Sequence, residues 1–295
     1  MKQLLIAGEI FWDQFPNGSI RQGGSALNVA WHLRGLDMHP CFISRIGQDD
    51  LGLKLVQAMK KWDLSTEFLQ LDSQHPTGVI KVLLDENKKP TFITPPIVAL
   101  DYIEYQPQFN EFSRDSVLYH GTFVLRNDVS RQTIQRIKSS GLKVFMDLNL
   151  RDPYWNVELL NEWAKNLEVL KLSDDEFASL SGKQNLSSHE QLDWLQDLMK
   201  KRNIRNVLYT MGDKGSFWIQ ENETLFESAK RVQVVDSIGA GDAFVAAVLF
   251  MMTLEFSKSE ILKAASGLAA EICTISGATS NDKQIYKNFR EKIWQ

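Results

Sequence analysis

Residues 236–242 read Asp236-Ser237-Ile238-Gly239-Ala240-Gly241-Asp242, and the interpretation of the chain starts from this glycine-rich turn. Arg231–Val235, just before it, predicts a strand, and Ala243–Met252, just after it, is apolar on every side, as a fully buried helix is. The turn therefore lies where a helix begins. Unpaired backbone N–H groups and the helix dipole at such a place favour an anion. Gly239, Ala240 and Gly241 leave room for a phosphoryl group to approach the backbone.

Asp242 adds an acid to the edge of this anion hole. A carboxylate there can take the proton from a hydroxyl that attacks a phosphoryl group, and it can equally be a plain helix cap. The chain contains no Gly-x-x-x-x-Gly-Lys-Ser/Thr motif, which excludes a P-loop nucleotidase. Gly239-x-Gly241 also lacks the third glycine and the early position of a dinucleotide fingerprint, which argues against an oxidoreductase.

Bulk composition narrows the class of protein. The 295 residues are 43% hydrophobic and 24% charged, with a net charge of -4, so we expect no nucleic-acid partner. No stretch reaches the ~18 apolar residues of a membrane span, and the short apolar start predicts a first strand and not a signal peptide. Cys41 and Cys273 lie far apart, which favours a reduced, cytoplasmic protein.

Strands alternate with helices along most of the chain. The expected strands are 4–7, 41–46, 117–120, 143–148, 169–172, 207–210 and 217–219, and the expected helices are 26–34, 52–61, 130–139 and 189–201. Ser188 and Gln191 suggest a capping box for the last helix. This rhythm predicts βαβ units and a mainly parallel sheet.

Two insertions interrupt that rhythm. Gly78–Leu84 and Pro90–Thr94 read as strands joined by the polar turn Asp85–Lys89, and Phe15–Gln22 is a second turn-rich excursion. Together they can build a small antiparallel flap over the strand ends, where open α/β sheets bind ligands. Two surface hairpins without a function are the alternative.

A second glycine cluster, Gly23-Gly24-Ser25-Ala26-Leu27-Asn28-Val29-Ala30, opens the first helix. Paired glycines permit a close backbone approach to a ligand, and Asn28 offers a donor and an acceptor to hydroxyl groups. Asp13, just after the first strand, can accept two hydroxyl hydrogen bonds. A helix-start residue and a turn former are the plain alternatives for Asn28 and Asp13.

With Gly35 and Gly47 following the N-terminal cluster, the two clusters together resemble the signatures of the ribokinase-like sugar kinases, the PfkB carbohydrate kinase family. The resemblance covers nearly the whole chain. It implies a single domain over residues 1–295, folded as a three-layer αβα sandwich with a small antiparallel β lid from about residues 15–22 and 77–95.

The resemblance implies roles for the residues at both clusters. Asp242 would be the general base, with Gly239, Ala240 and Gly241 as the anion hole. Asp147-Leu148-Asn149-Leu150-Arg151 is similar to a family stretch that carries proline at the position of Leu148. Arg151 would contact sugar or phosphate, with a surface ion pair as the alternative. The implied sugar-binding residues are Asp13, Gly23, Gly24, Asn28 and Arg151.

Further implied positions would hold the nucleotide and its ions. Thr210-x-Gly212-x-x-Gly215 resembles the nucleotide-binding turn, and Gly277 lies in the segment that closes over the adenine of ATP. Glu176 would organise Mg²⁺ through water, although Ser173 stands where relatives often carry Asn. Asp236 and the backbone of Ile238 would hold a monovalent cation such as K⁺.

The lid segment is similar to that of bacterial fructokinases through 76–85, 90–93, 101–105 and 120–122. The implied reaction transfers the γ-phosphoryl group of MgATP to D-fructose, giving fructose 6-phosphate. Another sugar, a sugar acid or a nucleoside is the alternative substrate, and a ligand-sensing homologue without catalysis is the alternative class. Val79, Val82, Leu84, Phe92 and Ile93 would either form a homodimer interface through the lid or pack its inner face.

Overall fold

Seven parallel strands form the centre of the protein in this computed structural model, which describes residues 3–84, 90–183 and 186–294. The sheet has the order β13-β12-β11-β10-β9-β8-β1-β4-β5. Its parallel members are β5 (Leu69–Asp72), β4 (Cys41–Gly47), β1 (Leu4–Ala7), β8 (Val117–His120), β9 (Lys143–Asp147), β10 (Leu167–Ser173) and β11 (Ile204–Thr210). The antiparallel strands β12 (Ser216–Ile219) and β13 (Thr224–Glu227) complete one edge.

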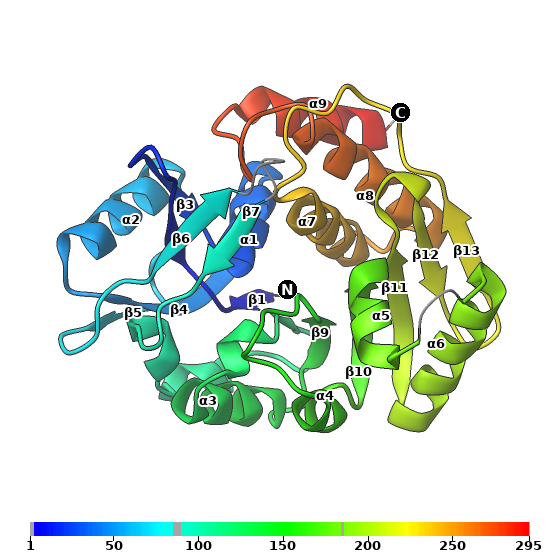
Figure 1. Cartoon of the computed structure of the whole chain (residues 1–295), viewed down its shortest axis with the longest axis horizontal. Helices are drawn as coiled ribbons and strands as arrows, with labels where there is room; N and C mark the ends of the chain where they lie inside the picture. The colour runs from blue at the N-terminus through cyan, green and yellow to red at the C-terminus, as the bar shows by residue number, and fades with distance from the viewer. Residues whose placement is uncertain (1–2, 85–89, 184–185, 295) are drawn as a thin grey trace.

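Helices cover both faces of this sheet, as Figure 1 shows. One face carries α1 (Ser25–Gly35), α2 (Asp50–Lys61), α7 (Ala240–Thr253), α8 (Lys258–Ile272) and α9 (Lys283–Ile293). The other carries α3 (Asp128–Lys138), α4 (Val157–Trp163), α5 (Asp174–Ser181) and α6 (Ser188–Arg202). Each layer packs a separate hydrophobic core against the sheet. The predicted three-layer αβα sandwich is confirmed.

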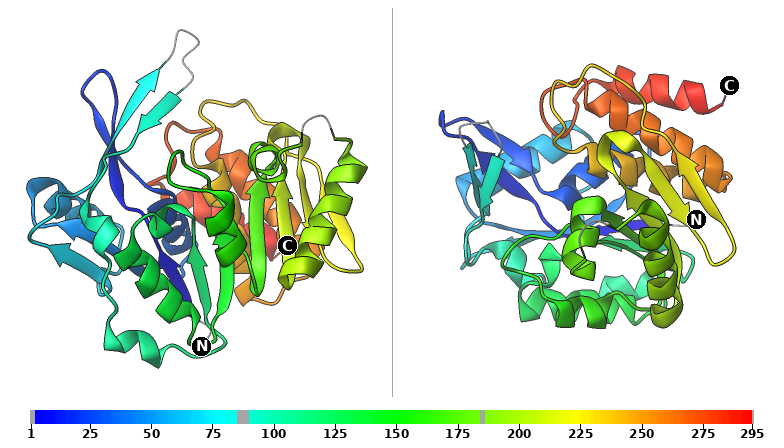
Figure 2. Two further views of the ribbon diagram at one scale, coloured as in Figure 1. Left: turned by 60° about the horizontal axis from the view of Figure 1, so that its bottom comes forward. Right: turned by 45° about the vertical axis from the view of Figure 1, so that its right-hand side comes forward.

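A four-stranded sheet stands apart from the main sheet as a lid (Figure 2). Its order is β3 (Ile20–Gly23), β2 (Phe11–Gln14), β6 (Val79–Leu84) and β7 (Pro90–Ile93). The pair β6–β7 is the predicted hairpin, and the predicted excursion Phe15–Gln22 holds the turn between β2 and β3 and most of β3. Both pairs are antiparallel. The two hairpins join through the parallel pair β2–β6. The sequence had not shown that Phe11–Gln14 belongs to the lid.

Alternation along β6 gives the lid one packed face. Ile80 and Val82 are buried, whereas Lys81 and Leu83 are exposed, as expected of a strand that covers a core on one side. Val79 is partly buried and Ile93 is 48% exposed. The side chains of Leu84 and Phe92 and the turn Asp85–Lys89 lie outside the described residues. The apolar lid residues predicted to form either a dimer interface or the packed inner face therefore do not all have the same exposure. Val82 is buried in the inner face, whereas Ile93 is half exposed.

The strand order reverses beside β1, and this places a ligand crevice. From β1 the chain builds β4 and β5 on one side, and then returns to β8 and continues to β11 on the other. Open α/β sheets bind ligands outside the carboxyl ends of the strands at such a switch point. The N-terminus of α7 lies at the same edge of the sheet, because Gly241 at its start approaches Lys171 near the carboxyl end of β10.

Two predictions about local structure were wrong. Arg231–Val235 is not a strand: Val234 and Val235 are exposed, and the main-chain N–H of Val235 bonds to the carbonyl of Cys273, outside any sheet. The capping box of α6 lies one residue earlier than predicted, at Ser187 and Glu190, because the Glu190 carboxylate accepts from the Ser187 N–H at 2.8 Å. No described helix is both long and apolar enough to cross a bilayer.

Candidate active site

Polar side chains gather where the parallel strands end. Glu9 follows β1, Asp147 ends β9, Ser173 ends β10 and Thr210 ends β11. Parallel strands present their carboxyl ends at one edge of a sheet, so these residues face the crevice beside the switch point. Asp147 and Glu9 are buried there. Buried acids in a cleft, with pKa values shifted by burial and by charged neighbours, are candidates for a functional site.

The predicted anion hole has the backbone that such a turn requires. Gly239 is the N-cap of α7 with φ of 81°, a left-handed conformation that glycine adopts without strain. A Cβ at Gly239 would lie 2.5 Å from the Cα of Ala278, so this turn packs directly on the segment that contains Gly277. Ala240 and Gly241 form the first turn of the helix, as predicted.

Asp242 joins the two glycine clusters. Its carboxylate accepts a hydrogen bond from the Ser25 hydroxyl at 2.6 Å and another from the Asn28 amide at 2.8 Å. The two donors lie 217 and 214 residues away along the chain. Burial raises the pKa of Asp242, and these hydrogen bonds together with Lys171 and Arg151 lower it in part. A partly buried carboxylate with a raised pKa is suited to accept a proton.

Asp13 and the two N-terminal glycines form a tight group between the lid and the sheet. A Cβ at Gly23 would lie 2.2 Å from Oδ2 of Asp13, and a Cβ at Gly24 would lie 2.4 Å from the Glu9 carbonyl. Gly24 also has φ of 107°. Only glycine leaves space at both positions. Burial raises the pKa of Asp13 to about 6, against the opposing effect of Arg151.

Arg151 is exposed near this group. It donates to the carbonyl of its neighbour Leu150 at 3.0 Å, and it belongs to none of the ion pairs formed by the described residues. Its charge nevertheless acts on Glu9, Asp13 and Asp242. The alternative of a surface ion pair gains no support from this arrangement.

Glu176 and Ser173 cap α5 as a pair. The Ser173 hydroxyl accepts from the Glu176 N–H at 3.2 Å, while Glu176 accepts from the N–H groups of Ser173 at 2.8 Å and Leu150 at 2.9 Å. Each carboxylate oxygen keeps a second lone pair that can bind a magnesium-bound water. In the part of the chain that the structure describes, no three His, Cys, Asp or Glu side chains cluster as a metal site.

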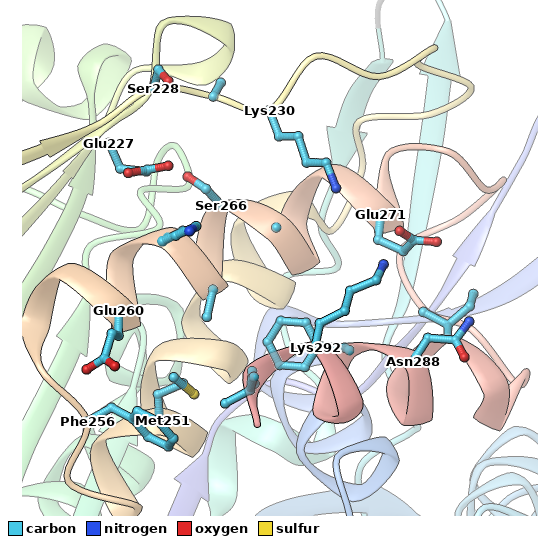
Figure 3. Close-up of a pocket in the computed structure, with 17 residues that line it drawn as sticks. Glu227, Ser228, Lys230, Met251, Phe256, Glu260, Ser266, Glu271, Asn288 and Lys292 are labelled. Carbon is cyan, nitrogen blue, oxygen red and sulfur yellow. The ribbon is translucent and has the colours of Figure 1, made fainter. Parts of the chain in front are cut away.

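The predicted nucleotide turn follows β11. Thr210 ends the strand, Gly212 has φ of 55°, and Gly215 has φ of 127°. A Cβ at Gly215 would lie 2.3 Å from the Glu227 carbonyl and 3.0 Å from the Cα of Ser228, so the turn packs on the end of β13 and on the segment that follows it. That segment borders a pocket of about 610 Å³ between α8 and α9, in which Figure 3 shows Lys230 and Lys292 reaching in from opposite sides near Glu271.

Asp236 ties two predicted segments together. Its carboxylate accepts from the main-chain N–H groups of Ile238 at 3.0 Å and Gly277 at 2.9 Å. The predicted monovalent-cation residues Asp236 and Ile238 therefore lie side by side, next to the segment predicted to close over adenine. Gly277 has φ of 92°.

Five polar residues of this crevice were not among the predicted site residues: Glu9, Ser25, Tyr119, Asp147 and Lys171. Tyr119 on β8 lies with its hydroxyl 3.4 Å from that of Ser25, and Glu9 keeps one carboxylate oxygen without a hydrogen-bond partner among the described residues. Lys171 on β10 forms a buried ion pair of 3.0 Å with Asp147. The signal for Lys171 was a lysine inside the otherwise apolar run Val169–Leu172.

Comparison with known proteins gives a family match. The profile of the pfkB family carbohydrate kinases matches residues 13–285. A fructokinase from Vibrio alginolyticus is 26% identical over 262 residues, which cover 84% of this chain and 83% of the relative. The aminoimidazole riboside kinase of Salmonella typhimurium is 29% identical over 272 residues, covering 86% and 82%.

A solved structure agrees with these sequence relatives. The fructokinase from Vibrio cholerae O395, with fructose, ADP and a calcium ion bound, superposes with a TM-score of 0.83 at 25% identity. The superposition covers 97% of this chain and 98% of that one.

Proposed function

Since the chain belongs to the pfkB family of carbohydrate kinases, we propose that it transfers the γ-phosphoryl group of ATP to a hydroxyl of a free sugar, D-fructose, giving fructose 6-phosphate. One observation carries the proposal above the others. Asp242 lies at the start of α7, between a turn suited to a phosphoryl group and two side chains from the N-terminal glycine cluster. A base and an anion hole within one turn are what phosphoryl transfer to a hydroxyl requires.

In the proposed reaction, proton removal accompanies the attack of the sugar hydroxyl. Asp242 takes the proton of the sugar hydroxyl as the oxygen attacks the γ-phosphorus, and the bond from that phosphorus to the bridging oxygen of ADP breaks. The N–H groups at Gly239, Ala240 and Gly241 receive the charge that develops on the phosphoryl oxygens. Mg²⁺, held through water at Glu176, would neutralise the phosphates.

The sugar would lie between the lid and α1. Asp13 on β2 accepts two hydroxyl hydrogen bonds, while the bare backbone at Gly23 and Gly24 lets the ring approach. Ser25 and Asn28 hold Asp242 toward the same space. Arg151 supplies a planar donor at the rim. Closing the lid over this space would exclude water that would otherwise accept the phosphoryl group.

The nucleotide would run from the anion hole to the pocket beside α8. The turn of Thr210, Gly212 and Gly215 and the segment at Gly277 border its path, and Ser228, which lines the pocket, lies next to Gly215. The relative solved with ADP supports a nucleotide in this fold. A K⁺ ion at Asp236 and Ile238 would add positive charge beside the turn.

Fructose is supported by the two fructokinase relatives and by the fructose in the solved one. A ribonucleoside-like substrate is the second candidate, because the aminoimidazole riboside kinase is 29% identical to this chain. The ligand-sensing reading remains the alternative if catalysis is absent.

A coupled ADP-release assay with MgATP and a panel of free sugars, sugar acids and nucleosides tests the function. We expect turnover with fructose, and Asp242→Asn should lower kcat by about 10²–10⁴-fold while sugar binding survives. Asp197→Asn, an exposed aspartate on α6, is the matched control and should behave as the wild type. Turnover with a nucleoside alone would replace the substrate. Sugar binding without turnover of any panel member would favour the sensor.

A further inference from the structure

Lys171 is a buried cation at the floor of the anion hole. It lies on β10, its side chain is only 9% exposed, and its ammonium nitrogen is 3.0 Å from Oδ1 and 3.3 Å from Oδ2 of Asp147. Lysine is almost never buried unless it is paired. A buried ion pair is often no more stabilising than two apolar side chains, so stability alone gives little reason for its position.

The nearest part of the anion hole is Gly241. A Cβ at this position would lie 3.7 Å from the ammonium nitrogen of Lys171, and nothing else lies closer. The backbone of Gly241 has ordinary helical angles, so conformation does not require glycine there. Its missing side chain instead leaves the space between the ammonium group and the start of α7 open.

The surroundings keep this lysine charged. Burial acts to lower the pKa of Lys171, but the carboxylates of Asp147, Glu176 and Asp242 outweigh it, and the pKa is raised. The ammonium group in turn lowers the pKa of Asp242. A helix terminus carries only about half a unit charge, whereas the ammonium carries a full one in a site of low dielectric.

We propose that Lys171 supplies the fixed positive charge of the anion hole, acting across the open space at Gly241 on the phosphoryl group that is transferred. The proposal rests on the sugar-kinase function above. Asp147 is then a positioning residue, since its carboxylate holds the ammonium group of Lys171 in place. The same charge favours the ionised form of Asp242, which must be a carboxylate to accept the proton.

Binding of nucleotides tests the charge without relying on catalysis. The γ-phosphoryl group is present in ATP and absent from ADP, so Lys171→Met should weaken ATP roughly tenfold more than ADP in calorimetric titrations. Lys138→Met is the matched control, since Lys138 is a partly buried lysine whose ammonium group bonds to the carbonyls of Trp163 and Lys165. It should leave both affinities unchanged.

Steady-state kinetics distinguish the loss of the positive charge of Lys171 from the loss of its ion pair with Asp147. Lys171→Met and Asp147→Asn both break the pair, but only the first removes the positive charge. We expect Lys171→Met to lower kcat about 10²–10³-fold, the range for losing one group that stabilises the transferred charge, and Asp147→Asn to lower it less than tenfold. Equal losses in the two variants would show a structural role and overturn the proposal.

The pH dependence of kcat/KM provides a second test of the charge on Lys171. The charged or titratable groups facing Asp242 are Glu9 after β1, Tyr119 on β8, Asp147 on β9, Lys171 on β10 and Arg151 after β9, with Glu176 on α5 behind Lys171. Removing the cation should move the acidic limb of kcat/KM to higher pH in Lys171→Met. Removing an anion should move it the other way in Asp147→Asn. A limb that stays in place in both variants would contradict the proposal.

If Lys171→Met alone does not fold, the double variant Lys171→Met/Asp147→Leu replaces the pair with apolar side chains, which buried ion pairs generally tolerate. It should fold and still lose the preference for ATP over ADP. Full preference for ATP in the folded double variant would sink the proposal. A wild type that binds ATP but phosphorylates nothing would instead refute the proposed function, and the nucleotide titrations would still decide the role of Lys171.

Discussion

Single residues in the crevice carry chemistry that depends on their burial. Asp13, Asp147 and Asp242 are ordinary acids in the sequence, and burial raises the pKa of all three, with Asp147 at about 7 and Asp13 at about 6. Groups that titrate near neutral pH can change their role within the range in which the protein works. The surroundings of each acid, more than its residue type, therefore decide whether it is suited to bind sugar or to accept a proton.

Asp13 gives a prediction at this scale. Below pH 6 the carboxyl group of Asp13 is protonated and loses acceptor capacity, so sugar affinity should fall as the pH drops from 7 to 5. The fall should be up to ~tenfold, the size expected for losing hydrogen bonds to a charged group. Calorimetric titration of fructose across this range measures it. Asp13→Asn should bind weakly with a flatter dependence on pH. An unchanged dependence in Asp13→Asn would assign the titration to another acid, such as Asp242.

Strand β3 of the lid forms hydrogen bonds across the crevice to the segment 276–279. Arg21 donates to the Ser276 hydroxyl at 3.1 Å, and Gln22 donates to that of Thr279 at 3.5 Å. Both partners belong to the segment around Gly277, which Asp236 holds next to the anion hole. The lid is thus tied to the part of the protein where the nucleotide is proposed to lie.

This contact predicts a role in excluding water. Arg21→Ala should loosen the lid, raise the KM for sugar several-fold and increase ADP release in the absence of sugar, because water then reaches the phosphoryl group. The coupled assay with and without fructose measures both quantities. Lys81→Ala, on the exposed face of β6, is the control that should change neither. Sugar-free ADP release at the wild-type level in Arg21→Ala would remove the contact from this role.

At the scale of the whole molecule, α1 and the C-terminal segment are joined through a buried histidine. His32 lies with Nδ1 2.9 Å from the Tyr286 hydroxyl and Nε2 3.0 Å from the Ala278 carbonyl. The carbonyl requires a proton on Nε2, so the neutral ring accepts at Nδ1. Trp31 and Trp62 stack beside it with ring centres 5.2 Å apart. This cluster fixes the first helix against the last.

His32 predicts a dependence of stability on pH. Burial lowers its pKa from 6.5 to about 4, so its neutral form stabilises the fold above pH 6.5, and this contribution is lost as the pH falls toward 4. Since tenfold in proton affinity equals about 1.4 kcal/mol, the loss is up to ~3 kcal/mol.

The free energy of unfolding in urea, measured at pH 7 and pH 4.5, gives the change in stability with pH for each variant. The variants must be compared with one another, because Asp13 and Asp147, whose pKa values are raised, stabilise the fold as the pH falls over the same range. His32→Gln should depend less on pH than the wild type. The exposed His189→Gln should match the wild type. Equal slopes for His32→Gln and the wild type would show that His32 does not drive the loss.

The sequence by itself determined the elements whose pattern is local. The apolar helix after Gly241, six of the seven parallel strands and the lid hairpin formed by β6 and β7 follow from periodicity and turn residues, which depend on near neighbours in the chain. It missed the strands β2, β5 and β13 and the helices α4, α5, α8 and α9. It also assigned a strand to Arg231–Val235, because β propensity does not say whether a partner strand is present.

The residues 236–242 show the same division within the site. Their small side chains already predicted a turn for an anion at a helix start, and Asp242 as either its base or its cap. Only the tertiary structure brought Ser25 and Asn28 to the Asp242 carboxylate and Lys171 beneath Gly241. These contacts join residues tens to hundreds of positions apart, and the strand order and the packing of α7 against α1 decide them, not local propensity.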